Sequence, residues 1–291
     1  MDRTSSLGTI FISGGTSGLG FQMAEHFVSS GASVIICGRN SVSVGNSIRV
    51  LKKMAPSNQA ILGFTCDVAD AASVSKMFGE LQQFGILINV MICNAGVIGP
   101  IDKYLENDLT EWQSAFNINL HGTVNMVKAT LPSMILEKKG RVIHISGGGA
   151  TSPLFGMSSY AASKAAAVRF IETLALEYSD AGITFNSVAP GMMKTQLLDQ
   201  MLEAGPERVG TNLFTKSSEK AASSSDSSQK AIELIDFLAG DASSGITGKL
   251  ISAEWDNWSE WPNHLDDLKS SDLYTLRRIT GRDRGQNWGD L

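Results

Sequence analysis

The sequence predicts an α/β fold in which helices cover both faces of a doubly wound, mostly parallel sheet of about seven strands. Apolar runs of strand length alternate with longer segments of helical period as far as about residue 190, which is the pattern of right-handed βαβ units. A glycine-rich run directly follows the first apolar run, and such runs commonly bind phosphate groups in folds of this class. Together these observations indicate a nucleotide-binding sheet.

The predicted strands are short and apolar, and the predicted helices lie between them. We expect strands at residues 9–13, 33–37, 61–66, 87–93, 141–146, 184–189 and 249–253. We expect helices at residues 19–30, 43–54, 71–84, 111–137 and 160–180. Because ligands of parallel sheets bind at the carboxyl ends of the strands, functional residues should directly follow the apolar runs.

Two parts of the chain depart from this alternation and set the expected domain boundaries. We expect one nucleotide-binding domain over residues 1–253 and a Trp-rich extension over residues 254–291 that caps the site or contacts another subunit. Residues 216–230 hold seven serines, so we expect a mobile loop or a solvated connector within a substrate loop or lid at 196–230. Three tryptophans within residues 255–261 are more typical of burial against the domain or a second subunit than of a substrate site.

Composition and charge argue against several classes of function. The 291 residues carry a net charge of -5 and no basic block, so the sequence does not predict binding to nucleic acid. Cys37, Cys66 and Cys93 lack the spacing of a disulfide framework, which favours reduced thiols in a soluble cytoplasmic protein. The four histidines are scattered and predict no metal site. The most apolar run, residues 86–93, is too short to cross a membrane.

The glycine-rich run lies between the first strand and the first helix. Its glycines have the spacing GxxxGxG, and its candidate cofactor-binding residues are Gly14, Thr16, Ser17, Gly18, Leu19 and Gly20. Glycines let a pyrophosphate approach the backbone, while the unpaired N–H groups and the dipole of the following helix hold negative charge. The spacing is weak by itself, but its position between a strand and a helix predicts a dinucleotide site.

The residues after the second strand favour NADP(H) over NAD(H). A site for the free 2′-hydroxyl of NAD usually places an acidic side chain here, whereas a 2′-phosphate requires a cation. Residues 26–66 contain no Asp or Glu, and the strand is followed by Gly38 and Arg39. The guanidinium of Arg39 suits a phosphate, and Gly38 leaves room for it. The alternative is an arginine that only faces solvent.

Short or small residues follow the third and fourth strands. They are Asp67 and Val68 after the third strand, and Asn94, Ala95 and Gly96 after the fourth. Such residues often form simple turns. In a sheet with a glycine-rich nucleotide loop, the same positions lie where adenine and ribose would bind.

Tyr160 and Lys164 are four residues apart in a predicted helix, so they share one face. A phenol has an unperturbed pKa near 10, and an adjacent ammonium is expected to lower it towards a range that is useful for proton exchange. A tyrosine beside a nicotinamide could give a proton to a carbonyl oxygen while the ring delivers hydride to the carbon. The pair therefore predicts carbonyl–alcohol redox chemistry.

Five motifs in this order resemble the short-chain dehydrogenase/reductase family. They are the glycine-rich run, Asn94-Ala95-Gly96, Asn119-Leu120-His121-Gly122, Tyr160-Ala161-Ala162-Ser163-Lys164 and Pro190-Gly191. The resemblance covers about residues 7–253. It implies a Rossmann fold that holds NADP at the strand-end residues described above, together with residues near the nicotinamide, namely Pro190, Gly191, Met193 and Thr195.

The resemblance also implies the roles of three side chains. Tyr160 would be the general acid/base, Lys164 would hold the nicotinamide ribose and tune the tyrosine, and Asn119 would position a water of the proton relay. Without the resemblance, Asn119 is simply a polar residue that bends a helix.

One position departs from the family pattern. The family usually carries a serine thirteen residues before the tyrosine, and this chain has Gly147 there. Ser146 is a tentative catalytic residue, because it could substitute only if the strand has already ended. The alternatives are a hydroxyl from Thr151, Ser152, Ser158 or Ser159, or backbone N–H donors of residues 146–149. Loss of such a donor typically costs about 10² to 10³ in rate.

The sequence therefore predicts an NADP-dependent oxidoreductase that acts on a small carbonyl or alcohol substrate. The family resemblance and the tryptophan cluster favour a homodimer or homotetramer. Gly147 motivates one alternative, a cofactor-binding sensor or scaffold with little turnover. A sugar-nucleotide epimerase or dehydratase ranks lower, because such relatives have a different glycine spacing.

Overall fold

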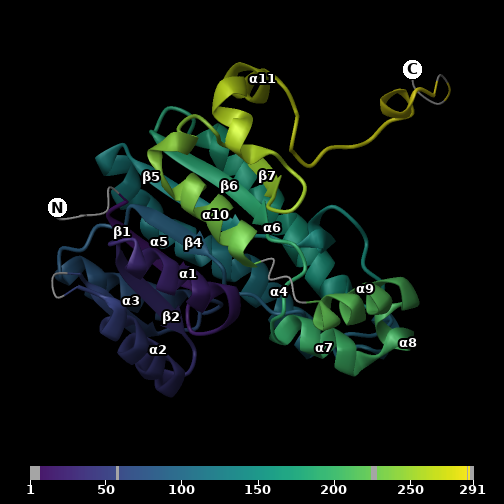
Figure 1. Ribbon diagram of the computed structural model, residues 1–291, viewed down its shortest axis with the longest axis horizontal. Helices are drawn as coiled ribbons and strands as arrows, with labels where there is room; N and C mark the ends of the chain where they lie inside the picture. The colour runs from purple at the N-terminus through teal and green to yellow at the C-terminus, as the bar shows by residue number, and fades with distance from the viewer. Residues whose placement is uncertain (1–6, 57–58, 224–227, 287, 289–291) are drawn as a thin grey trace.

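Seven parallel strands form one sheet in the computed structural model, which describes residues 7–56, 59–223, 228–286 and 288 (Figure 1). The strands are β1 (Thr9–Ser13), β2 (Ser33–Gly38), β3 (Ile61–Thr65), β4 (Val90–Cys93), β5 (Gly140–Ile145), β6 (Ile183–Ala189) and β7 (Lys249–Ser252). Their order is β3-β2-β1-β4-β5-β6-β7, and every neighbouring pair is parallel. The predicted fold class is confirmed.

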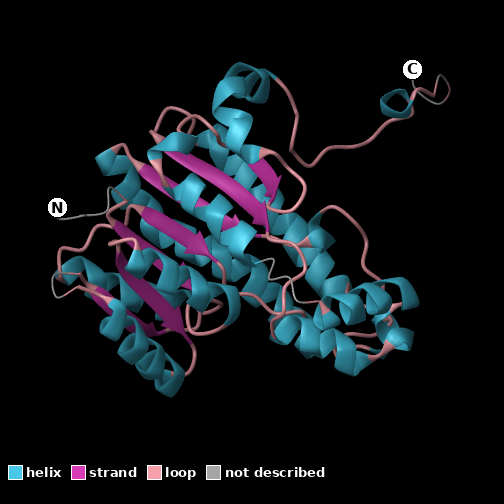
Figure 2. Cartoon of the chain, in the orientation of Figure 1, coloured by secondary structure: helices cyan, strands magenta, loops and turns pink. Residues whose placement is uncertain are grey.

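Helices cover both faces of this sheet (Figure 2). One layer contains α1 (Gly18–Ser29), α2 (Ser41–Met54) and α10 (Ser228–Ala239), and the other contains α3 (Ala71–Gln83), α5 (Gly122–Glu137) and α6 (Ser158–Glu177). In β1, Ile10 and Ile12 pack into the first layer, and Phe11 between them packs into the second. The strands are therefore apolar on both faces, which is why the sequence shows them as continuous apolar runs.

The winding of the chain reverses between β1 and β4. From β1 the chain proceeds outward to β2 and β3, and from β4 it proceeds in the opposite direction to β7. A parallel sheet with such a reversal has a crevice at the carboxyl ends of the two central strands. This crevice fixes the location of the candidate site.

The long helix predicted for residues 111–137 is interrupted. The structure has α4 (Leu109–Phe116), a π-helical turn at Asn117–His121 and then α5. Single π-helical turns inside α-helices are frequent at functional sites. Gly122 follows the turn, and a Cβ on it would lie 2.7 Å from a methyl group of Val68. The close approach of this turn to the loop after β3 explains why residue 122 has no side chain.

The serine-rich segment is largely helical, which differs from the predicted loop or connector. It follows α7 (Gln196–Ala204) and α8 (Pro206–Val209), and its described part belongs to α9 (Thr211–Ala222) and the start of α10. Residues 224–227 lie outside the described part. Ser217 and Ser218 donate to the carbonyls of Leu213 and Phe214, four residues earlier. These serines satisfy their hydroxyls within the helix, so composition alone misjudges the segment.

The C-terminal extension packs against the parent sheet before it leaves the body of the protein (Figure 1). It contains a 3-10 segment, Trp258–His264, and α11 (Leu265–Ser270). Trp261 is buried, and Trp258 is partly buried beside Phe237. Trp255, by contrast, is 85% exposed. Two of the three tryptophans therefore serve packing within the chain, and the third does not.

Candidate active site

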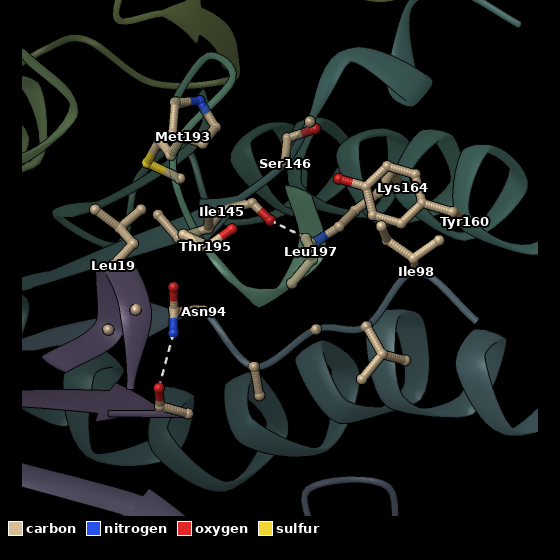
Figure 3. Close-up of a pocket in the computed structure, with 18 of the residues that line it drawn as sticks. Leu19, Asn94, Ile98, Ile145, Ser146, Tyr160, Lys164, Met193, Thr195 and Leu197 are labelled. Carbon is tan, nitrogen blue, oxygen red and sulfur yellow. Dashed lines mark hydrogen bonds between the residues drawn. The ribbon is translucent and has the colours of Figure 1, made fainter. Parts of the chain in front are cut away.

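A cavity of about 1030 Å³ lies at the carboxyl ends of the strands (Figure 3). Of the candidate site residues, all but Asn119 line it: Gly14, Thr16, Ser17, Gly18, Leu19, Gly20, Arg39, Asp67, Val68, Asn94, Ala95, Gly96, Ser146, Tyr160, Lys164, Pro190, Gly191, Met193 and Thr195. Residues separated by up to about 180 positions in the sequence thus share one space.

The glycine-rich loop between β1 and α1 has no room for side chains at its glycines. Gly14 and Gly18 adopt positive φ angles of 65° and 50°, a region that residues with a Cβ rarely occupy. A Cβ on Gly20 would lie 2.2 Å from the carbonyl oxygen of Gly14, and one on Gly14 would lie 2.9 Å from Cα of Ala95. The loop therefore exposes bare backbone at the start of α1, where N–H groups and the helix dipole attract anions.

Asn94 links this loop to the end of β4. Its side-chain amide donates to the carbonyls of Ser13 and Gly14 at 3.0 and 3.1 Å. The hydroxyl of Ser13 accepts in turn from the backbone N–H of Asn94 and of Ala95. The side chain of Asn94 is thus committed to holding the loop, and the backbone after β4 forms the cavity wall (Figure 3).

Asn119 lies behind the cavity wall, in the π-helical turn, and is completely buried. Its side-chain oxygen accepts from the N–H of Val97 at 2.8 Å, and its amide donates to the carbonyl of Val97 and the hydroxyl of Ser163, both at 2.9 Å. This side chain therefore joins the segment after β4 to α6. Its hydrogen bonds position the helix that carries Tyr160 and Lys164.

Tyr160 and Lys164 lie together on α6, with the ammonium nitrogen 5.9 Å from the centre of the tyrosine ring. Lys164 is buried and donates to the carbonyl of Ile145 at 2.7 Å (Figure 3). Burial lowers the pKa of Lys164 to about 8 and raises the pKa of Tyr160 to about 12. The expectation that the ammonium lowers the tyrosine pKa is thus wrong for this structure, because the loss of hydration on burial determines the direction of the shift.

The structure resolves the position of Ser146 at the end of β5. The strand ends at Ile145, so Ser146 lies beyond it and lines the cavity. Its hydroxyl is buried and has no hydrogen-bond partner among the described residues. A Cβ on Gly147 would lie 2.2 Å from the hydroxyl of Tyr160. The space that a serine side chain at position 147 would occupy is therefore filled by the tyrosine.

Several hydroxyl groups that follow β5 already have hydrogen-bond partners within the protein. Ser158 accepts from the indole N–H of Trp112 at 2.9 Å, and Ser159 donates to the carbonyl of the same residue at 2.6 Å. Thr151 lines the cavity, but its hydroxyl is directed to the carbonyl of Gly148 at 3.4 Å. Ser152 is exposed and does not line the cavity, so Ser146 is the candidate whose unpaired hydroxyl lies in it.

Arg39 lies on the exposed rim of the same cavity, next to the glycine-rich loop. No ion pair involving Arg39 occurs within the described ranges of the chain. A Cβ on Gly38 would lie 2.9 Å from a methyl group of Thr16, so the backbone comes close to the loop here. The guanidinium is available for an anionic ligand.

Two walls of the cavity are built by side chains that the sequence analysis did not name. One wall is apolar and surrounds Tyr160; it is built by Ile98, Leu154, Met157, Leu197, Met201 and Leu213. The other comes from the C-terminal extension and is built by Trp255, Asp256, Tyr274 and Thr275. The sequence predicted a substrate loop at 196–230 and a capping extension, but which of their side chains line the cavity depends on tertiary packing.

Two further sequence expectations concern absences. In the ranges that the structure describes, no three His, Cys, Asp or Glu side chains gather where they could hold a metal ion. No described helix is long and apolar enough to cross a membrane. Cys37, Cys66 and Cys93 are free thiols and are buried.

Comparison with known proteins identifies the family. The short chain dehydrogenase model matches residues 8–205. The chain is 30% identical over 247 residues to subunit BbsD of a hydroxy(phenyl)methylsuccinyl-CoA dehydrogenase from Thauera aromatica, an alignment that covers 82% of this chain and 92% of the relative. This chain therefore belongs to the short-chain dehydrogenase/reductase family of NAD(P)-dependent oxidoreductases, which act on small molecules.

Solved structures show the same fold. An actinorhodin polyketide ketoreductase with NADPH superposes with a TM-score of 0.76 at 23% identity, covering 84% of this chain and 95% of that one. A xylitol dehydrogenase bound to NAD⁺ superposes with a TM-score of 0.74 at 19% identity, covering 84% and 97%. Proteins with this fold thus occur with NADPH and with NAD⁺.

The hydrogen bonds of Asn119 lead to a prediction about stability. Asn119→Ala should lower the free energy of unfolding by about 2 to 4 kcal/mol, because it leaves both backbone groups of Val97 without these partners. Urea unfolding followed by circular dichroism measures this free energy. The matched control is Asn125→Ala, which removes one bond to the carbonyl of Val68 and should cost about 1 kcal/mol. Equal losses of unfolding free energy for the two variants would contradict this structural role of Asn119.

Proposed function

We propose that this protein transfers hydride between NADP(H) and a carbonyl or alcohol substrate, with Tyr160 as general acid/base. The observation that carries the proposal is that Tyr160 and Lys164 line the same cavity as the glycine-rich loop and the start of α1. The cradle fits a dinucleotide, because its glycines leave no Cβ between the backbone and a pyrophosphate. When bound, the nicotinamide would supply or accept the hydride.

The residues around the cavity would bind the cofactor and transfer the proton. The glycine-rich loop would hold the pyrophosphate, and the backbone at Gly96, Pro190 and Gly191 would border the nicotinamide end. Lys164, held by the carbonyl of Ile145, would bind the ribose hydroxyls. The hydroxyl of Tyr160 would give its proton to the carbonyl oxygen during reduction and take one from the alcohol during oxidation.

The alternative of a cofactor-binding sensor or scaffold receives no support from the relatives, which are dehydrogenases and reductases by name. The same holds for an epimerase or dehydratase. The prediction of a homodimer or homotetramer in the cytoplasm remains a prediction.

The test of the proposed function is turnover by the wild type and by Tyr160→Phe. General acid–base groups contribute about 10² to 10⁴ in rate, so the variant should lose at least that much of kcat while it still binds NADPH. Ketones, aldehydes, keto sugars and 3-oxoacyl thioesters, with consumption of NADPH read at its absorbance, provide the assay. Binding of NADPH without turnover of any substrate by the wild type would refute the proposal and favour the sensor.

The same pair of proteins tests the pH dependence. Carbonyl reduction needs the protonated tyrosine, and burial raises its pKa to about 12, so deprotonation of Tyr160 should not lower the rate of reduction between neutral and alkaline pH. Alcohol oxidation needs the phenolate and should rise with pH over the same range. A fall in oxidation with rising pH would contradict the role of Tyr160.

The preference for NADP(H) would come from Arg39, whose position on the rim suits a 2′-phosphate. Arg39→Ala should raise KM for NADPH about 10- to 100-fold, because charge-assisted hydrogen bonds are typically worth 1.5 to 3 kcal/mol. KM for NADH should change less than about twofold. Arg49→Ala is the matched control, since Arg49 bonds to Asn46 on α2 away from the cavity. Equal weakening of both cofactors by Arg39→Ala would overturn this preference.

Ser146 would take the place of the hydroxyl that the family usually carries at position 147. Ser146→Ala should lower kcat about 10²- to 10³-fold, the usual cost of a lost donor to a developing oxyanion. Gly147→Ser should lower activity as well, because its Cβ would displace the hydroxyl of Tyr160. Ser152→Ala, on the exposed part of the loop, is the control. Full activity of Ser146→Ala, or a gain from Gly147→Ser, would refute this role.

A further inference from the structure

The C-terminal extension contributes its own wall to the active-site cavity. Trp255 and Asp256 line the cavity just after β7, and Tyr274 and Thr275 line it from a later turn of the extension. These residues lie outside the segment that matches the family model, which ends at residue 205. The family model therefore does not describe this wall.

Buried charges hold this wall in place. The ammonium of Lys249 donates to the carbonyls of Leu273 and Ser271 at 2.9 and 3.4 Å. The carboxylate of Glu172 on α6 accepts from the N–H of Leu276 at 2.7 Å. Lys249 and Glu172 are both buried, so these bonds are shielded from water and strong. They fix the residues on either side of Tyr274.

Tyr274 itself is fixed from two sides. Its carbonyl accepts from the N–H of Leu250 in β7 at 2.8 Å, which attaches the extension to the edge of the sheet. Its ring lies 4.2 Å from that of the buried Trp261. Its φ angle is 59°, in a region that a residue other than glycine seldom adopts. Structure that over-determines such a conformation is often functional.

The chemistry of this wall differs from that of the wall around Tyr160. The wall around Tyr160 is aliphatic, whereas the extension offers two aromatic rings, a carboxylate and the hydroxyl of Thr275. Trp255 is 85% exposed and Tyr274 40% exposed, and both line the cavity, so their rings are accessible to a ligand there. One carboxylate oxygen of Asp256 accepts from the N–H of Ser252 at 2.7 Å, which fixes the orientation of the group.

We propose that the wall formed by Trp255, Asp256, Tyr274 and Thr275 binds a polyhydroxylated ring of the carbonyl substrate and so determines specificity. The C–H face of such a ring packs on indole, and its hydroxyls donate to the carboxylate of Asp256. The inference rests on the proposed function for the reacting carbonyl. It adds the chemical class of the substrate, a hydroxyl-bearing cyclic ketone or the matching polyol.

The test compares two ketones that share one ring. Cyclohexanone lacks hydroxyls, and inosose is the same ring with a hydroxyl on every remaining carbon. Trp255→Ala and Asp256→Asn should each raise KM for inosose at least about tenfold, the effect of about 1.4 kcal/mol, while kcat changes little. KM for cyclohexanone should be unaffected by Asp256→Asn, whereas Trp255→Ala should raise it as well, because the C–H face of this ring also packs on the indole. Trp288→Ala removes an equally exposed tryptophan outside the cavity and should change neither value.

A binding measurement separates this inference from the proposed function. Calorimetry of inosose with NADPH-loaded Tyr160→Phe needs no turnover and should show binding that the added Trp255→Ala weakens at least about tenfold. If inosose binds but the wild type turns over none of the carbonyl substrates of the turnover assay, the proposed function fails and the ring-binding wall stands. If inosose binds no better than cyclohexanone, or if Asp256→Asn weakens both alike, the inference is wrong.

Discussion

The junction between β1 and β4 is the constraint on which the rest of the site depends. The winding of the sheet reverses there, so the connections that follow these paired strands run in opposite directions beyond the last ladder pair. Ser13 and Asn94 join the ends of the two strands through four hydrogen bonds. The glycine-rich loop can follow this path only without side chains, because a Cβ on Gly20 would meet the carbonyl of Gly14 at 2.2 Å. The cavity is maintained because the carboxyl ends of β1 and β4 are both held in place.

Burial governs the chemistry of the two ionisable residues on α6. Loss of hydration disfavours the charged form of each, which is why the pKa of Lys164 falls to about 8 and that of Tyr160 rises to about 12. The hydrogen bond from Lys164 to the carbonyl of Ile145 fixes the ammonium in the cavity wall. Asn119 and Ser163 fix the helix itself. The site is thus rigid before any ligand enters, which is the arrangement that favours a defined proton-transfer geometry.

The departure from the family pattern at Gly147 becomes intelligible in three dimensions. The tyrosine hydroxyl occupies the space next to this glycine, and the hydroxyl of Ser146 is buried in the same cavity without a partner. The backbone remains extended at Gly147, and both Ser146 and Gly147 line the cavity. Gly147 lacks the hydroxyl that the family usually carries, and the neighbouring Ser146 has an unpaired hydroxyl. This is why we propose that Ser146 takes over that role.

The sequence by itself determined the α/β fold, the glycine-rich loop and nearly every candidate residue that lines the cavity next to that loop. These features depend on local patterns, since apolar runs, glycine spacing and the Tyr160–Lys164 interval each act over a few residues. Only the tertiary structure decided the direction of the tyrosine pKa, the structural use of Asn94 and Asn119, and the entry of Tyr274 into the cavity. Each of these depends on burial or on contacts between residues distant in sequence. Hydration and long-range packing are properties of the folded chain, so no local pattern contains them.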